Sequence, residues 1–227
     1  MNLRRFPKSR LLHSLRKPPY RWENYGRIRF VSDRIKELPL NGPKVLDAGG
    51  ATGNNLLRKF GIEDVTTLDL HASADIVSSA ADMPVEDGAF DVATCIDTLE
   101  HIPQDLRIKV VEELLRVASK AVFVVAPLDS PENNQAEELV LKYTRSRFLE
   151  EHREHGLVDF DALEALLPPL VEEGRVARYD RHELDCLLNW VLSMTRSDIS
   201  ADRIYPEAYF LENRFCPRRV ALCVYKA

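Results

Sequence analysis

The chain has 227 residues, of which 45% are hydrophobic and 30% charged, and its net charge is −5. These values are typical of a globular protein with one large α/β domain. The longest apolar run, residues 121–128, is far shorter than the roughly 20 residues of a membrane span, and the first thirty residues hold no secretory signal pattern. The four cysteines have no CxxC spacing. We therefore expect reduced thiols and a cytoplasmic protein.

Charge is distributed unevenly along the chain. Residues 1–36 contain eleven Lys and Arg residues against two acids, a net charge of +9, so residues 37–227 carry −14. A solvated basic arm explains this pattern. The other reading is a segment that contacts phosphate, on a lipid headgroup, a nucleic acid or a phosphorylated substrate. Contact with lipid headgroups would place the protein at the periphery of a membrane.

Hydrophobic spacing predicts helices that alternate with continuously apolar strands. In chain order we expect a helix over 25–40, a strand over 44–48, a helix over 54–61, strands over 64–70, 74–79 and 90–97, a helix over 104–118, a strand over 120–128, helices over 148–156 and 161–170, a strand over 175–181, a helix over 182–194 and a last strand over 218–227. This alternation favours a doubly wound α/β fold with a mostly parallel sheet and helices on both faces.

The first strand ends in an acid and a glycine-rich turn, "KVLDAGGATGNN" over residues 44–55. The turn brings backbone N–H groups close to a ligand, and the next helix would aim its positive N-terminus at an anion. The spacing does not fit the G-x-G-x-x-G pattern of dinucleotide binders. Asp47 would repel a pyrophosphate but suits a cationic amine. S-adenosylmethionine offers an ammonium, a carboxylate and a ribose, and Asp69 ends the next strand, where a ribose is read.

Residues 44–128 resemble the core of the class I S-adenosylmethionine-dependent methyltransferases, of the type 11-like group, in "VLDAGGATG", "TTLDL", "AADMPVEDGAFDVATCIDTLEHI" and "LLRVASKAVFVVAPL". The resemblance implies a seven-stranded sheet with an antiparallel last strand. It also implies that Asp47 and the turn bind the methionine part of the cofactor and that Asp69 binds the ribose. Asp82 and the Met83 backbone would contact adenine. The implied cofactor-binding set is Asp47, Gly49, Gly50, Ala51, Gly53, Asp69, Leu70, Asp82, Met83 and Asp97. The family usually has glycine where this chain has Ala51.

The segment "DTLEHI", residues 97–102, follows the fourth strand beside the expected methyl-transfer zone. His101 is the candidate catalytic base, because its ordinary pKa lies near neutrality. The alternative is a packed, hydrogen-bonded histidine. Asp97 and Glu100 are also candidates for contact with the acceptor.

Two further histidines, His152 and His155, lie three residues apart in a predicted helix. A metal site there would need a third ligand, such as His182 or Asp161. Surface histidines on a charged helix are commoner, so we expect no metal site.

The sequence thus predicts a basic N-terminal arm and helix over 1–40 and a methyltransferase domain over 41–227, with a mainly helical acceptor-side insertion at about 129–217. The expected acceptor is an oxygen or nitrogen of a small molecule. The segment 148–167 is similar to one in methyltransferases encoded beside glycosyltransferases, so sugars and lipid-linked glycans are also possible acceptors.

Two alternatives stay open. Ala51 favours a non-catalytic S-adenosylmethionine-binding module. The basic arm favours an RNA methyltransferase, although the body is acidic and lacks an N-P-P-Y-type tetrapeptide, so a nucleic-acid partner is not expected.

Overall fold

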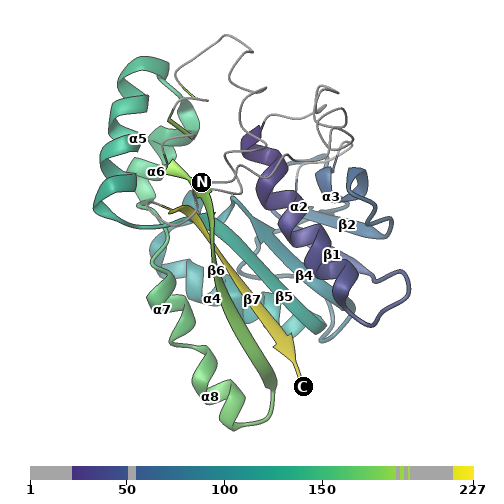
Figure 1. Cartoon of the computed structure of the whole chain (residues 1–227). Coiled ribbons are helices and arrows are strands. Elements are labelled where there is room, and N and C mark those ends of the chain that lie inside the picture. Colours follow the sequence, from purple (N-terminus) through teal and green to yellow (C-terminus); the bar gives the residue numbers. More distant parts are fainter. Residues whose placement is uncertain (1–21, 51–54, 188–189, 192–193, 195–216) are drawn as a thin grey trace, which may run out of the picture.

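The computed structural model describes the whole chain except residues 1–21, 51–54, 188–189, 192–193 and 195–216 (Figure 1). Its centre is a seven-stranded sheet in the order β3-β2-β1-β4-β5-β7-β6. The strands are β1 (Val45–Ala48), β2 (Val65–Asp69), β3 (Ile76–Val77), β4 (Phe90–Ile96), β5 (Ala118–Pro127), β6 (Val176–Cys186) and β7 (Pro217–Lys226). The first five are parallel, whereas β7 runs antiparallel to both β5 and β6. The predicted fold class and antiparallel last strand are confirmed.

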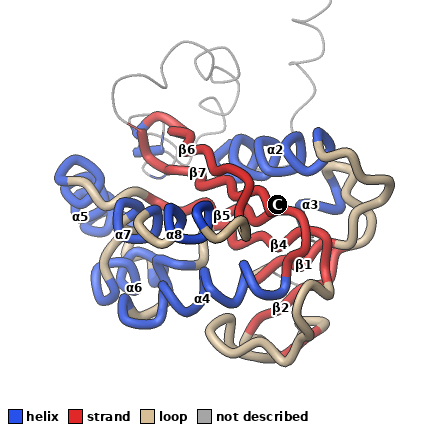
Figure 2. The backbone as a smooth tube through the Cα atoms, turned by 90° about the horizontal axis from the view of Figure 1, so that it is seen from below, coloured by secondary structure: helices blue, strands red, loops and turns tan. Residues whose placement is uncertain are grey.

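Helices cover both faces of the sheet (Figure 2). The helices are α2 (Trp22–Glu37), α3 (Leu56–Lys59), α4 (Gln104–Val117), α5 (Pro131–Thr144), α6 (Arg147–His155), α7 (Phe160–Glu164) and α8 (Leu167–Glu172), with a short 3₁₀ turn η1 (Leu99–His101) after β4. Helices α2 and α3 lie on one face, and α4, α7 and α8 lie on the other. Among the described residues, no helix is long and apolar enough to cross a bilayer.

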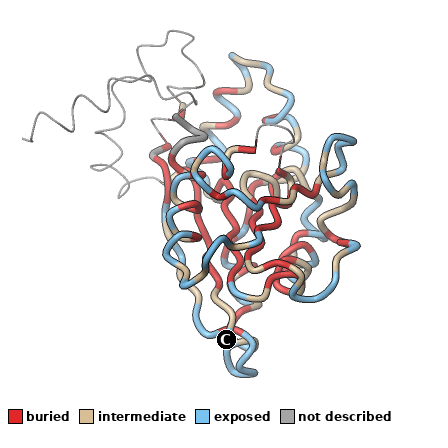
Figure 3. Tube along the Cα trace, turned by 90° about the vertical axis from the view of Figure 1, so that its right-hand side faces the viewer, coloured by how far each residue is buried: buried red, intermediate tan, exposed pale blue. Residues whose placement is uncertain are grey.

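Strand alternation divides the apolar side chains of the sheet between two cores, and the buried residues run through the middle of the molecule (Figure 3). On one face, Val31 and Ile35 of α2 pack against sheet residues that include Val92 and Phe123. On the other face, α4, α7 and α8 pack against the alternate positions of the same strands. The N-terminal helix is therefore part of the packed body. Two described cysteines, Cys95 and Cys223, are buried free thiols, as predicted.

Basic residues of α2 form ion pairs and hydrogen bonds with other groups of the protein. Arg27 forms an ion pair with Asp97 at 3.0 Å, and Arg34 pairs with Glu37 at 2.7 Å. Lys36 donates to the backbone carbonyl of Phe60. The predicted phosphate contact of residues 1–36 stays a prediction, and residues 1–21 of that segment lie outside the described residues.

The prediction of a helix over 182–194 is wrong in its first part. Strand β6 continues to Cys186, because its backbone pairs with β7 as far as the register Cys186↔Pro217. The described residues Leu187, Trp190, Val191 and Met194 are helical. Pairing along a whole neighbouring strand here outweighs the helical spacing of the apolar side chains.

Two other helical predictions need correction. The helix predicted over 161–170 is two short helices, α7 and α8, because prolines at the start of α8 remove backbone donors. Helix α5 was not predicted. Its polar sequence hides it, but Ser130 caps its N-terminus by accepting from the Asn133 N–H, and Pro131 stands at its first turn.

Candidate functional site

The site lies where the strand order reverses, between β1 and β4, at the carboxyl ends of the parallel strands. Three segments meet at this edge. They are the turn after β1, the end of β2 at Asp69, and the segment from Asp97 to His101 that follows β4. The sequence predicted all three as parts of the site. The doubly wound topology makes them neighbours, since β1 pairs with both β2 and β4.

The first two residues of the turn after β1 leave no room for side chains. Gly49 has φ +78°, and a Cβ added there would lie 2.1 Å from the Thr98 Oγ1. A Cβ on Gly50 would lie 2.4 Å from the Asp47 Oδ2. The Gly49 N–H donates to the Leu68 carbonyl at 2.7 Å, which ties the turn to β2. Ala51 and Gly53, the other predicted turn residues, lie outside the described residues.

Asp47 fastens the turn to its neighbours. Its side chain is buried, with Oδ1 accepting from the Thr94 hydroxyl at 2.6 Å and Oδ2 from the Asn55 amide at 2.7 Å. Asn55 also caps α3 by accepting from the Leu57 N–H at 2.9 Å. Burial raises the pKa of Asp47, and the two hydrogen bonds partly oppose that rise. The carboxylate therefore joins β1, β4 and α3, and direct contact with an ammonium stays a prediction.

At the end of β2, Asp69 and Leu70 face outward. Asp69 is half-buried, and its Oδ1 accepts from the backbone N–H of His71 at 2.8 Å, which forms a tight local turn. Leu70 is 76% exposed. A carboxylate beside an open apolar side chain is suited to a ligand with a diol next to a flat ring.

The predicted adenine contact is held by α4. Asp82 is exposed, whereas Met83 is buried. The Met83 N–H donates to Glu113 Oε2 at 2.8 Å, and the Met83 carbonyl accepts from Arg116 at 3.0 Å. Because Met83's backbone groups are already bonded within the protein, the Asp82 side chain is the part of this pair that faces solvent.

Asp97 is surrounded by cations. It accepts two hydrogen bonds from Arg219, at 2.8 and 2.7 Å, and pairs with Arg27 at 3.0 Å. Arg219 also contacts Asp185 at 3.0 Å. Burial alone would raise the pKa of Asp97, but the two guanidinium groups outweigh it and hold that pKa well below its usual range. Contact between this carboxylate and a cofactor or acceptor stays a prediction. In the structure Asp97 anchors the segment after β4, where its own φ is +48°.

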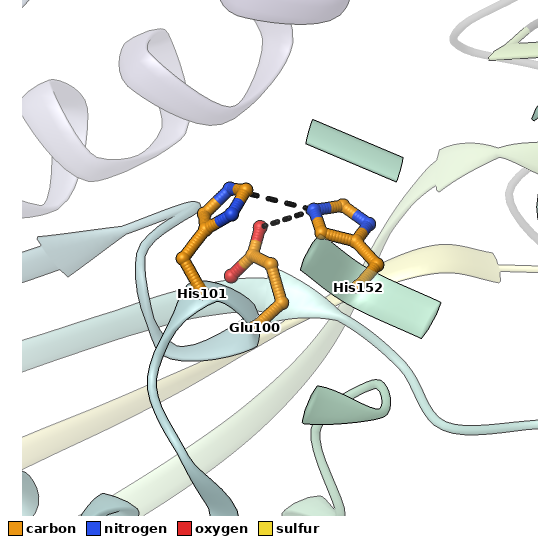
Figure 4. Close-up of side chains that lie close together, drawn as sticks. All are labelled: Glu100, His101 and His152. Carbon is orange, nitrogen blue, oxygen red and sulfur yellow. Dashed lines mark hydrogen bonds and ion pairs between the residues drawn. The ribbon is translucent and has the colours of Figure 1, made fainter. Parts of the chain in front are cut away.

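Glu100 and His101 of η1 meet His152 of α6, as Figure 4 shows. The two Nε2 atoms of the histidines are 3.4 Å apart, and His152 Nε2 lies 4.0 Å from Glu100 Oε1. Glu100 is 1% exposed and His152 7% exposed. Burial, together with the charge of Asp97, raises the pKa of Glu100 to about 8. Burial and the neighbouring His152 lower the pKa of His101.

Each of these histidines is oriented by a carboxylate. His101 Nδ1 lies 2.9 Å from Glu151 Oε2, and His152 Nδ1 lies 2.9 Å from Glu137 Oε1. Glu137 in turn pairs with the buried Arg218. Sequence reasoning missed these supporting residues, because they come from α5, α6 and β7 and share no local spacing with "DTLEHI". Of the residues that the sequence suggested as metal ligands, His152 belongs to this cluster, whereas His155, His182 and Asp161 do not.

Comparison with known proteins decides the family. A family model described as a methyltransferase domain matches residues 22–169, well over half of the chain. The chain belongs to this family. A search of curated proteins found no match.

Solved structures share the fold of this methyltransferase. The plantazolicin methyltransferase BpumL, in complex with a pentazolic desmethylPZN analog and SAH, is 15% identical, with TM-score 0.56, and 96% of this chain and 90% of that chain are covered. An S-adenosylmethionine-dependent methyltransferase from Archaeoglobus fulgidus is 15% identical, with TM-score 0.52 and coverage of 90% and 98%. YcgJ from Bacillus subtilis is 16% identical, with TM-score 0.52 and coverage of 88% and 98%.

The described residues that bear on a bound S-adenosylmethionine lie at the ends of β1 and β2. Gly49 and Gly50 admit no side chain, because a Cβ there would clash with Thr98 or Asp47, and their N–H groups donate to the Leu68 and Asp47 carbonyls. Asp69 lies at the neighbouring strand end, and Leu70 stands open beside it. The fit to S-adenosylmethionine rests on the Asp69 carboxylate and the open Leu70 side chain, and their contact with ribose and adenine stays a prediction.

Proposed function

We propose that the protein transfers a methyl group from S-adenosylmethionine to an oxygen or nitrogen of a small molecule, with sugars and lipid-linked glycans as the first acceptors to test. The observation that carries the proposal is the meeting of the turn that begins at Gly49 and Gly50, the half-buried carboxylate of Asp69 and the η1 segment at one edge of the sheet, in a chain of the methyltransferase family.

Each residue has a defined part in this proposal. The Gly49 and Gly50 turn, anchored by Asp47, holds the methionine end of the cofactor; Asp69 binds the ribose diol, and Leu70 and Asp82 flank the adenine. When bound, the cofactor supplies a methyl group already activated on a sulfonium. The chain's own contribution is to hold donor and acceptor in line, which can lower the barrier by about 7–11 kcal/mol.

His101 is suited to remove a proton from an acceptor. Its contact with the Glu151 carboxylate favours a hydrogen on Nδ1, so Nε2 offers the lone pair. Burial lowers the pKa of His101, so the imidazole is neutral and able to accept a proton at neutral pH. The Phe148 ring, 68% exposed, stands edge-on to the His101 ring at 5.8 Å and gives an acceptor an apolar surface.

Calorimetric titration with S-adenosylmethionine and its demethylated product tests the proposal. We expect micromolar binding to the wild type that Asp69→Ala removes. Asp64→Ala is the matched control, because Asp64 is an exposed acid just before the opposite end of the same strand, β2. Equal binding by wild type and Asp69→Ala would refute the ribose assignment, and no binding by folded wild type would refute the cofactor assignment.

A screen of acceptors for release of the demethylated product then tests transfer itself. Sugars and lipid-linked intermediates come first, followed by small amines and RNA. Cofactor binding without turnover on any class would favour the non-catalytic module instead.

A further inference from the structure

Two lone pairs face one another between η1 and α6. Each histidine has its Nδ1 against a carboxylate, Glu151 for His101 and Glu137 for His152, both at 2.9 Å. A carboxylate accepts and does not donate, so the proton of each neutral ring belongs on Nδ1. Both Nε2 atoms are then acceptors, yet they are only 3.4 Å apart. Two acceptors at that distance need a cation between them.

A third donor stands beside the pair. Glu100 Oε1 lies 4.0 Å from His152 Nε2, and one ligand atom from each of Glu100, His101 and His152 lies within 4.8 Å of the others. Glu100 is 1% exposed, and its Oε2 has no hydrogen-bond partner among the described residues. Asp97 and Glu137 are each paired with an arginine, whereas the ion-pair contact of Glu100 within the described part of the chain is His152. A buried carboxyl group of this kind either holds a proton or is paired with a cation, and a metal ion can take the place of that proton.

We propose that Glu100, His101 and His152 bind one divalent transition-metal ion. Metal–nitrogen bonds of about 2.1 Å in a tetrahedron put neighbouring ligand atoms about 3.4 Å apart, which matches the distance between the two Nε2 atoms. Two imidazoles and one carboxylate suit zinc, manganese, iron or cobalt, whereas calcium and magnesium prefer oxygen ligands. The site differs from the histidine pair that the sequence brought forward, and it departs from the expectation of no metal site.

The carboxylates behind the histidines complete the arrangement. Metal-bound histidines usually donate their other ring N–H to a carboxylate, which fixes the tautomer and raises the basicity of the ligand. Glu151 and Glu137 have that position here, and Arg218 holds Glu137 in place.

The location of the ion gives it a role, and this role rests on the proposed methyl transfer. Three protein ligands leave a coordination position open, as in catalytic metal sites. An acceptor hydroxyl bound there would lose its proton to solvent more readily, because a metal ion lowers the pKa of a bound oxygen. The ion would then replace His101 as the group that activates the acceptor, and it would favour an oxygen acceptor over a nitrogen.

Metal titration of the full chain, first stripped with a chelator, tests the site. We expect one Zn²⁺ per chain by calorimetry, and Co²⁺ should give the visible absorption of a low-coordinate ion bound by nitrogen. His101→Ala and Glu100→Gln should weaken binding at least 100-fold, and Glu151→Gln should weaken it about 10- to 100-fold. His155→Ala, on the same helix but outside the cluster, should bind as the wild type does.

The opposing results are equally clear. A folded, stripped wild type that binds no ion at micromolar concentration would mean that a proton shared by the two rings is the cation, and the proposal would fall. It would also fall if His101→Ala bound metal as tightly as the wild type. His101 is 25% exposed, so we expect this variant to fold, and thermal unfolding checks it. Titration with S-adenosylmethionine in the same samples separates failure of the metal site from failure of the proposed function.

Discussion

Replacing Gly49 by alanine should lower the free energy of unfolding much more than the same replacement at Gly174. Both glycines have positive φ, +78° and +70°, so each alanine incurs a backbone cost of about 1–2 kcal/mol. A Cβ at Gly174 meets nothing within 4 Å, whereas a Cβ at Gly49 lies 2.1, 2.3 and 2.8 Å from three Thr98 side-chain atoms. Overpacking of that kind costs a further 1–3 kcal/mol or so. Gly49→Ala should therefore lower the free energy of unfolding by about 2–5 kcal/mol, against about 1–2 kcal/mol for Gly174→Ala.

Thermal and urea unfolding measure this difference, which is worth roughly 2–4 °C in Tm per kcal/mol at this chain length. A double-mutant cycle with Thr98→Gly isolates the clash, because it removes all three atoms that the new Cβ meets. We expect a coupling free energy of about 1–3 kcal/mol in favour of the double variant. Equal destabilisation by Gly49→Ala and Gly174→Ala, or coupling below about 0.5 kcal/mol, would refute the claim that Thr98 closes this turn to side chains.

Two other replacements test the supports of the site. Arg219→Met should lower the free energy of unfolding in urea by about 3–5 kcal/mol, because it leaves Asp97 and Asp185 buried without this guanidinium. The control Arg175→Ala breaks an exposed pair with Glu173 and should lower it by less than about 1 kcal/mol. Equal losses for the two variants would contradict the reasoning. Asn55→Ala should cost about 1–2 kcal/mol and lower cofactor affinity, because it removes both the cap of α3 and a donor to Asp47; an unchanged unfolding midpoint would show that neither hydrogen bond matters.

Local sequence was sufficient for the first half of the sheet. There, each strand is a short apolar run, and each ligand segment follows its own strand within a few residues, as Gly49 follows β1 and Asp69 ends β2. The parallel topology then brings these ends together without further information. This is why the turn, Asp69 and the segment after β4 could be predicted together.

The structure of the second half of the sheet depends on pairings between residues that are distant in the sequence. Strand β6 has helical spacing in its last residues, and its extended form comes from its pairing with β7, which runs from Val176↔Lys226 to Cys186↔Pro217. The neighbours of His101 and Asp97 could not be predicted either, because Glu151 is 50 residues away and Arg219 is 122 residues away. A pattern within "DTLEHI" can therefore indicate that His101 is a candidate, but not which tautomer it has or what it faces.

The first residues of β7 explain how the two halves of the site are held together. Consecutive residues of a strand point to opposite faces, so Arg218 and Arg219 serve different sides of the sheet. Arg218 pairs with Glu137, which orients His152 on α6, while Arg219 pairs with Asp97, which anchors the segment that carries Glu100 and His101. Both ends of the histidine pair are thus positioned from one dipeptide. Within the described part of the chain, Asp97, Asp185 and Glu137 each form an ion pair with an arginine and Glu100 forms none, and this is the physical reason that the histidine cluster has a place for a cation.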